Sequence, residues 1–187
     1  CEALKKLRSS VSPMPYAQVA QIVECSYGRP LEEVFSSFDE QALGSASIAQ
    51  AHAAVLCSGE QVVVKVQRKG IHDIMSRDIM LLKQACKLLQ YTPVSDLVDF
   101  NQVLDEMWVV AQEEMNFQTE AANLERFRKL NQDVAFVTSP LLYREYTTTH
   151  VLVMERIDGI AIDDRAALLD AGYDLSEIGA KLADNYI

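Results

Sequence analysis

Residues 42–67, ALGSASIAQAHAAVLCSGEQVVVKVQ, combine small residues and a lysine at a spacing that could bind phosphate. In protein kinases, a loop with the pattern G-x-G-x-x-G lies one hairpin before a lysine that pairs with nucleotide phosphates. Here the glycine positions hold Gly44, Ala46 and Ala49, and the distance to Lys65 accommodates two short strands and a tight turn. The spacing favours a phosphate-binding loop, although Lys65 taken alone reads as an exposed strand lysine.

A lysine that pairs with phosphate needs a carboxylate to position it, normally a glutamate on the next helix. No glutamate occurs between Lys65 and Glu106, so the simple kinase pattern fails here. Either there is no phosphate clamp, or a helix is inserted and the partner lies in EEMNFQTEAANLERF. The candidates are then Glu113, Glu114 and Glu120. A single helical glutamate more often lies on a solvated face.

The elements that would position these residues follow from periodicity and turn signals. Helical patterns are expected at 14–27, 71–89, 97–130 with a kink, and two short stretches after 163. A short amphipathic piece covers 31–38, and strands are expected at 48–56, 61–67, 135–146 and 151–157. Asp174 and Glu177 form a D-x-x-E cap for the last helix. Segregated strands and helices predict an α+β fold.

The overall charge narrows the range of partners. The chain has 27 Asp and Glu against 17 Lys and Arg, a net charge of −10. Duplex binding needs clustered positive charge, so nucleic acid is not expected as a partner. The four cysteines lack C-x-x-C spacing, which argues against zinc. The chain begins at Cys1 and stops within a helical pattern, so we expect a piece of a longer protein.

Four segments together resemble the UbiB/AarF family of atypical kinases, also called the ADCK family. They are YGRPLEEVFSSFDEQALGSASIAQAHAA, VVVKVQRKGI, EEMNFQTEAANLERF and VLVMERIDGI. The resemblance implies a protein-kinase-like fold whose inserted helix explains the long gap between Lys65 and its glutamate. It also implies an alanine-containing loop in place of the glycine-rich one.

The resemblance assigns roles to individual residues. Lys65 is similar to the nucleotide-phosphate lysine and Glu114 to its helix partner, and these two are the expected catalytic residues. Glu120 resembles a second family glutamate that faces a helical extension over the active site. The expected nucleotide-binding residues are Gly44, Ser45, Ala46, Ser47, Lys65, Met154, Glu155 and Ile157, the last three in the adenine-binding hinge.

The same resemblance divides the chain. Residues 1–40 are expected to form a helical N-terminal extension, and 41–157 a kinase-like N-lobe. Within that lobe, 71–90 is the inserted helix and 97–130 takes the place of the kinase helix C. Residues 158–187 would hold the hinge and the truncated start of the C-lobe.

Several family features are absent or altered. The K-x-G-Q, H-x-D and D-F-G motifs do not occur, and DFN at 99–101 is interpreted as a helix entry. The ligands of Mg are therefore expected beyond Ile187, and the chain alone is expected to be inactive. Asn116 stands where the family usually has Asp, and Ala51 where it has Val. Alanine costs about 1 kcal/mol in a left-handed conformation, so Ala46 and Ala49 are expected to reshape the loop.

The resemblance implies the ATP-binding part of an atypical kinase or ATPase, a phosphotransferase that supports isoprenoid quinone metabolism. Expected partners are the nucleotide and, through regions outside this chain, quinone-biosynthesis proteins or a membrane surface. An intracellular location follows, mitochondrial or plastid in a eukaryote and membrane-associated in a bacterium. The alternatives are a non-catalytic pseudokinase scaffold and a lipid- or quinone-binding regulatory module.

Overall fold

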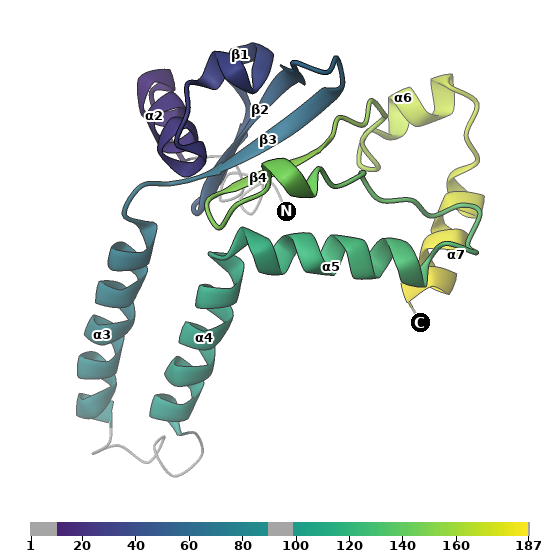
Figure 1. The fold of residues 1–187 in the computed structure, drawn as a ribbon. Coiled ribbons are helices and arrows are strands. Elements are labelled where there is room, and N and C mark those ends of the chain that lie inside the picture. Colours follow the sequence, from purple (N-terminus) through teal and green to yellow (C-terminus); the bar gives the residue numbers. More distant parts are fainter. Residues whose placement is uncertain (1–10, 90–98, 187) are drawn as a thin grey trace.

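The computed structural model describes residues 11–89 and 99–186 and contains a four-stranded antiparallel sheet (Figure 1). The strand order follows the sequence: β1 (Phe35–Ser45), β2 (Ala49–Leu56), β3 (Gln61–Gln67) and β4 (Val151–Glu155). β4 therefore returns from far along the chain to pair with β3. Residues 1–10, 90, 97–98 and 187 of the expected elements lie outside the described residues.

One face of the sheet is packed with aliphatic side chains. Val62, Val64 and Val66 alternate along β3 and are fully buried. They pack with Val19 and Val23 of helix α2 (Tyr16–Tyr27), which ends at Gly28 in a left-handed conformation. Burying each side chain contributes about 2 kcal/mol, so this face supplies much of the stability of the lobe. The expected helix at 14–27 and strand at 61–67 are confirmed.

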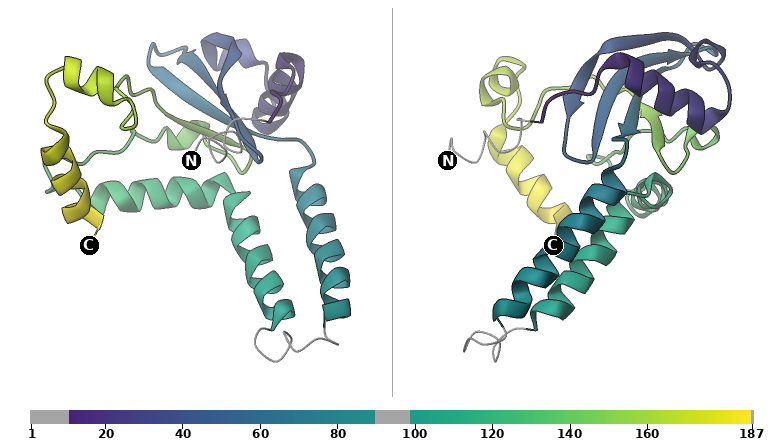
Figure 2. Two further views of the ribbon diagram at one scale, coloured as in Figure 1. Left: turned by 180° about the vertical axis from the view of Figure 1, so that it is seen from behind. Right: turned by 90° about the vertical axis from the view of Figure 1, so that its left-hand side faces the viewer.

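Helix α5 (Phe117–Leu130) crosses the opposite face, where Phe117 and Ala121 pack against Ala49 and Leu152. Two further helices, α3 (Ile71–Leu89) and α4 (Phe100–Glu114), pack side by side as a hairpin that projects away from the sheet (Figures 1 and 2). The expected helix at 97–130 is therefore two helices, with a sharp change of direction between α4 and α5.

One expected strand is wrong, and one strand of the sheet was not expected. The segment 135–146 is not a strand: it contains one isolated bridge, from Leu142 to Met154, and the 3-10 turn η3 (Arg144–Tyr146). Conversely, the expected amphipathic piece at 31–38 is the 3-10 turn η1 (Leu31–Glu33) followed by the start of β1. Strand β1 therefore crosses the expected boundary at residue 40.

The chain closes with α6 (Arg165–Asp170) and α7 (Leu175–Tyr186). Asp174 Oδ1 accepts from the main-chain N–H groups of Ser176 and Glu177, at 2.8 and 3.4 Å, as the capping pattern predicts. Asp99 caps α4 in the same way, so DFN is a helix entry. None of the described helices is both long enough and apolar enough to cross a membrane.

Candidate nucleotide site

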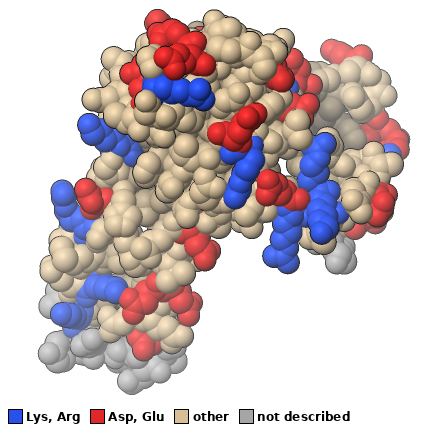
Figure 3. Space-filling view, in the orientation of Figure 1, with Lys and Arg blue, Asp and Glu red and all other residues tan. Residues whose placement is uncertain are grey.

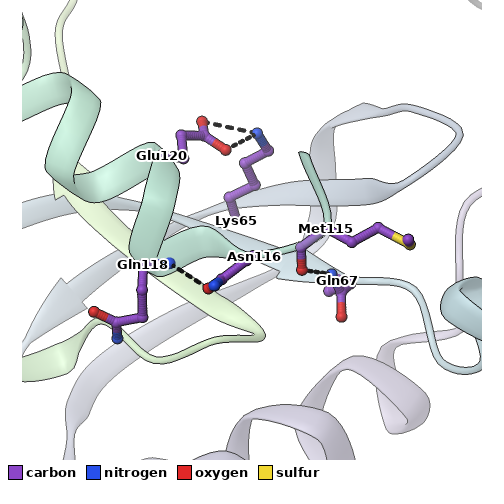
Figure 4. Close-up of polar contacts among 6 residues, drawn as sticks. All are labelled: Lys65, Gln67, Met115, Asn116, Gln118 and Glu120. Atoms are coloured by element: carbon purple, nitrogen blue, oxygen red, sulfur yellow. Dashed lines mark hydrogen bonds and ion pairs between the residues drawn. The ribbon is translucent and has the colours of Figure 1, made fainter. Parts of the chain in front are cut away.

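The lysine singled out by its sequence context lies on a central strand and forms an ion pair. The main chain of Lys65 is paired with Ala51 of β2 and Leu152 of β4. Its Nζ donates to both carboxylate oxygens of Glu120, at 2.9 and 2.7 Å (Figure 4). The ring of Phe117 lies below the ammonium, 5.0 Å from Nζ to the ring centroid. The lysine is thus held from two sides.

This ion pair corrects an expectation. Glu114 was expected to be the carboxylate partner of Lys65, and Glu120 was expected to face a helical extension. In the structure, Glu120 is the carboxylate that pairs with Lys65. Glu120 lies in the first turn of α5, which packs on the sheet, whereas Glu114 is the last residue of α4. The change of helix direction between them decides which carboxylate reaches Lys65.

A hollow of about 300 Å³ adjoins the pair. It is lined by Lys65, Val110, Glu113, Glu114, Thr119, Glu120 and Asn123. All three candidate glutamates therefore reach one space, although only one of them bonds the lysine. About a third of each side chain of the Lys65–Glu120 pair is exposed, which leaves the ammonium accessible to a ligand. Ion pairs this exposed add at most about 1 kcal/mol to the stability of a protein. The main effect of this pair is therefore to fix the position of the Lys65 ammonium, and its contribution to folding is small.

The junction between α4 and α5 is fixed by distant residues. Gln67 Nε2 donates to the carbonyl of Met115 (Figure 4). Phe117 N donates to the carbonyl of Thr149 at 3.1 Å. His150 Nδ1 donates to Gln67 Oε1 at 2.6 Å, so both the nitrogen and the oxygen of this buried amide are bonded. Gln67 is not among the site residues predicted from the sequence. The available signal was a polar residue on the same strand face as Lys65.

The substitution at residue 116 keeps a local role. Asn116 is the N-cap of α5, and its side-chain oxygen accepts from Gln118 N at 3.0 Å. Asn and Asp are equally good N-caps, so asparagine preserves the helix start while removing a negative charge near Lys65. Ala51, opposite Lys65 on β2, is partly exposed, and nothing in the structure explains why it replaces valine.

The expected phosphate loop is the turn between β1 and β2. Gly44 and Ser45 end β1, while Ala46 and Ser47 enter the turn, which Ala46 N closes by donating to Ala49 O at 2.8 Å. None of these described residues has a positive φ. This turn requires no left-handed residue, so Ala46 and Ala49 have no steric cost in it. The expectation that the two alanines reshape the loop over a nucleotide stays a prediction.

The expected hinge follows β4. Met154 packs beside Leu152 on the face that carries Lys65, and Glu155 ends the strand. Glu155 N donates to Leu141 O at 2.8 Å, and Arg156 N donates to Gln61 O at 3.1 Å. In the described part of the chain, Ile157 is the first hinge residue whose main chain has no partner within the protein. It could therefore bind a ligand without breaking an internal bond.

A metal centre is not formed by these residues. Across 11–89 and 99–186, no group of three or more His, Cys, Asp or Glu side chains is arranged to hold a metal ion. Figure 3 shows acidic and basic side chains interspersed on the visible face, without a continuous basic area. The site is thus a small acidic hollow with one ammonium.

Comparisons with known proteins extend these observations. Residues 6–187 match the sequence pattern of a protein family described as "ABC1 atypical kinase-like domain". The protein named Probable protein kinase UbiB of Marinobacter nauticus is 36% identical over 188 residues, covering 96% of this chain and 33% of that protein. Protein ACTIVITY OF BC1 COMPLEX KINASE 8, chloroplastic, of Arabidopsis thaliana is 36% identical over 189 residues, covering 100% of this chain and 25% of that protein.

A solved structure has a similar fold. The complex of Rv3197 with erythromycin from Mycobacterium tuberculosis matches with a TM-score of 0.70 and 29% identity. The match covers 87% of this chain and 40% of that one. An uncharacterized protein of Clostridium pasteurianum is 36% identical over 98% of this chain and 34% of its own length. The chain therefore spans a quarter to a third of the curated relatives described here.

Proposed function

The chain belongs to the ABC1 atypical kinase-like family, and on that premise we propose that it forms the ATP-binding part of an atypical kinase or ATPase of the UbiB type. The observation that carries the proposal is the Lys65 ammonium. Lys65 lies on a central strand, and its ammonium is held in place by Glu120 of α5. The ammonium is partly exposed and lies beside a hollow. Phosphoryl transfer depends mainly on such positioned charge.

Each part of the site has a role in this proposal. Lys65 pairs with phosphate oxygens, and Glu120 holds the ammonium in place while the ligand binds. The turn from Gly44 to Ser47 covers the phosphates. The hinge from Met154 to Ile157 receives the adenine, with hydrogen bonds at the unpartnered main chain of Ile157.

The charges that line the hollow favour binding of a nucleotide already complexed with a metal cation. Three carboxylates face one ammonium there, so a bare triphosphate would be repelled. Magnesium supplies charge neutralisation when bound to ATP. The described residues form no metal site, so we propose that the ion binds as part of the ligand, with further protein ligands beyond Ile187. On the same reasoning, residues 1–187 alone are inactive.

The test is a titration of the full-length protein with Mg-ATP, comparing wild type with Lys65→Met. We expect the affinity for ATP to fall about tenfold or more, because one charge-assisted pair is lost. Lys69→Met is the matched control, since Lys69 is exposed and close in sequence but outside the hollow. Equal ATP affinities for wild type and Lys65→Met would refute the proposal. They would favour the scaffold alternative.

For the cellular role we propose isoprenoid quinone metabolism, either ubiquinone or plastoquinone. The support is membership of a family in which relatives carry the names UbiB and ACTIVITY OF BC1 COMPLEX KINASE. The proposed location is a plastid or mitochondrion in a eukaryote and the cytoplasmic membrane surface in a bacterium. Proposed partners are quinone-biosynthesis proteins or that membrane surface.

Quinone content of cells lacking the protein, measured by chromatography, tests this role. We expect the content to fall, and to recover with wild type but not with Lys65→Met. Unchanged quinone content would contradict the role. Full recovery with Lys65→Met would mean that the role needs no nucleotide, as the lipid- or quinone-binding alternative predicts.

A further inference from the structure

The turn between β1 and β2 is held in shape by a residue that is distant in sequence. Arg68 follows β3 directly, and its main-chain N–H donates to Ile48 O at 2.8 Å. Its Nε donates to Ala46 O at 2.8 Å, and its Nη2 donates to Ser45 Oγ at 2.6 Å. One residue therefore bonds three positions of the turn.

The same guanidinium reaches the N-terminal segment. Arg68 Nη2 also donates to Ser12 O, at 2.9 Å. Two residues after Ser12, Met14 is bonded through both of its main-chain groups by the side chain of Gln50. Gln50 Oε1 accepts from Met14 N at 2.6 Å, and Gln50 Nε2 donates to Met14 O at 3.3 Å. Gln50 is directly opposite Ser45 in the β1–β2 ladder. The segment around Ser12 and the turn are thus joined at two neighbouring points.

The Gln50 amide, whose orientation is fixed by the two main-chain groups of Met14, also contacts a buried histidine. Gln50 Nε2 lies 2.9 Å from His52 Nε2, and His52 Nδ1 lies 2.8 Å from Asp39 O. An amide nitrogen donates and a main-chain carbonyl accepts, so Gln50 donates to His52 and His52 donates to Asp39. These bonds help to hold the Gln50 side chain beside Met14.

The turn has no glycine-dependent backbone of its own. Four residues, 46–49, connect the paired residues Ser45 and Gln50, and none of them has a positive φ. Loops of this length are most often built around a type I turn, which most residues can adopt. The contacts specific to this turn are therefore the bonds from Arg68 to Ser45, Ala46 and Ile48.

We propose that Arg68 is a positioning residue for the phosphate loop, which ties the shape of the loop to the docking of the N-terminal segment. The proposal rests on the nucleotide site proposed above. Nε and Nη2 of Arg68 donate to Ala46, Ser45 and Ser12, so these donors hold the loop and the N-terminal segment. Preorganising the loop lowers the ordering cost of binding the phosphates.

The first test is hydrogen exchange of the loop in the full-length protein without nucleotide. Arg68→Met is expected to speed exchange at residues 45–49 about tenfold, since two side-chain bonds to the loop are lost. Ser45→Ala removes one of these bonds and is expected to give a smaller increase. Lys69→Met is the matched control and is expected to leave the loop unchanged. Wild-type exchange rates in Arg68→Met would overturn the proposal.

The second test separates positioning from general destabilisation by comparing two ligands. For Arg68→Met we expect the Kd for Mg-ATP to rise about tenfold, and the Kd for adenosine to change less than about twofold, because the loop contacts only phosphates. Arg68→Lys keeps the charge but bonds fewer acceptors, so partial recovery of ATP affinity is expected. Equal losses for ATP and adenosine would indicate a purely structural role and overturn the proposal.

The two proposals fail in different ways. If wild type binds neither ligand, the nucleotide site is refuted, while the exchange measurement still decides whether Arg68 holds the turn. If wild type binds ATP and Arg68→Met binds it equally well, only the positioning role is refuted.

Discussion

The two faces of the central sheet are held by different forces. On the α2 face, Val62, Val64 and Val66 pack into the buried hydrophobic core. On the α5 face, Lys65 and Gln67 from the same strand bond to Glu120 and to the α4–α5 junction. Burial is non-directional and tolerates small shifts, whereas an ion pair and an amide bridge require defined positions. One strand thus stabilises the lobe on one side and positions a charge on the other.

The largest effect is expected on the α2 face. Val64→Asp would bury an unpaired carboxylate at a fully buried position, at a cost of about 4 kcal/mol or more. Urea unfolding followed by circular dichroism measures this loss. Val63→Thr, on the partly exposed opposite face, should cost less than about 1 kcal/mol. If Val64→Asp and Val63→Thr lost similar amounts of unfolding free energy, the two faces would not differ in their contribution to stability.

The next effect concerns the amide bridge. Gln67→Leu removes the donor to Met115 O and the acceptor for His150 Nδ1, so a carbonyl loses its partner at a buried site. The expected cost is about 2 kcal/mol. Because the bridge fixes the junction, the affinity for ATP should fall as well, although Gln67 does not line the hollow. A stability loss with wild-type ATP affinity would show that the junction does not control the site.

The cap of α5 is expected to have a smaller effect. Asn116→Ala removes the side-chain acceptor for Gln118 N, which should cost about 1 kcal/mol. Asn116→Asp keeps an N-cap and should leave the unfolding free energy nearly unchanged. Thermal unfolding of both variants measures the difference. Equal melting temperatures for Asn116→Ala and wild type would mean that tertiary contacts alone fix the helix start.

The dependence of stability on pH is expected to report on the α2 face of the sheet. Tyr27, on α2, donates its hydroxyl to Tyr146 O at 2.7 Å, and burial raises the pKa of the Tyr27 hydroxyl well above its usual value near 10. The unfolded chain therefore ionises first, so this contribution to stability is complete below about pH 10 and is lost as pH rises further. Tyr27→Phe should flatten the alkaline decline in unfolding free energy. An unchanged decline would contradict this assignment.

The smallest stability effect is expected at the ion pair. Glu120→Gln and Glu114→Gln should each change the unfolding free energy by less than about 1 kcal/mol. The two should differ in ATP affinity: Glu120→Gln frees Lys65 and weakens binding, whereas Glu114→Gln reduces the acidity of the hollow and leaves the lysine in place. A greater loss of ATP affinity in Glu114→Gln would restore Glu114 as the partner of Lys65 in the ligand-bound state.

Much of the fold follows from local patterns. Alternation identified β3, periodicity with Gly28 identified α2, and Asp174 with Glu177 identified the start of α7. The segment 135–146 was misjudged because its apolar residues are as frequent as in a strand. Its backbone instead bonds β4 at separate points, such as Tyr143 N to Val153 O. Strand β1 was missed because its polar, mostly exposed residues lack a buried alternation.

The sequence by itself determined the family, the α+β class and the two residue types that meet at the site, a lysine and a glutamate. The fold class follows from patterns read within single elements, and the family follows from four motif segments spread along the chain. Which glutamate meets Lys65, and how the β1–β2 turn keeps its shape, was decided only by tertiary structure. Gln67 and Thr149 set the helix junction that brings Glu120 to the lysine, and Arg68 bonds the turn. Such contacts join residues far apart in the chain, so no local pattern predicts them.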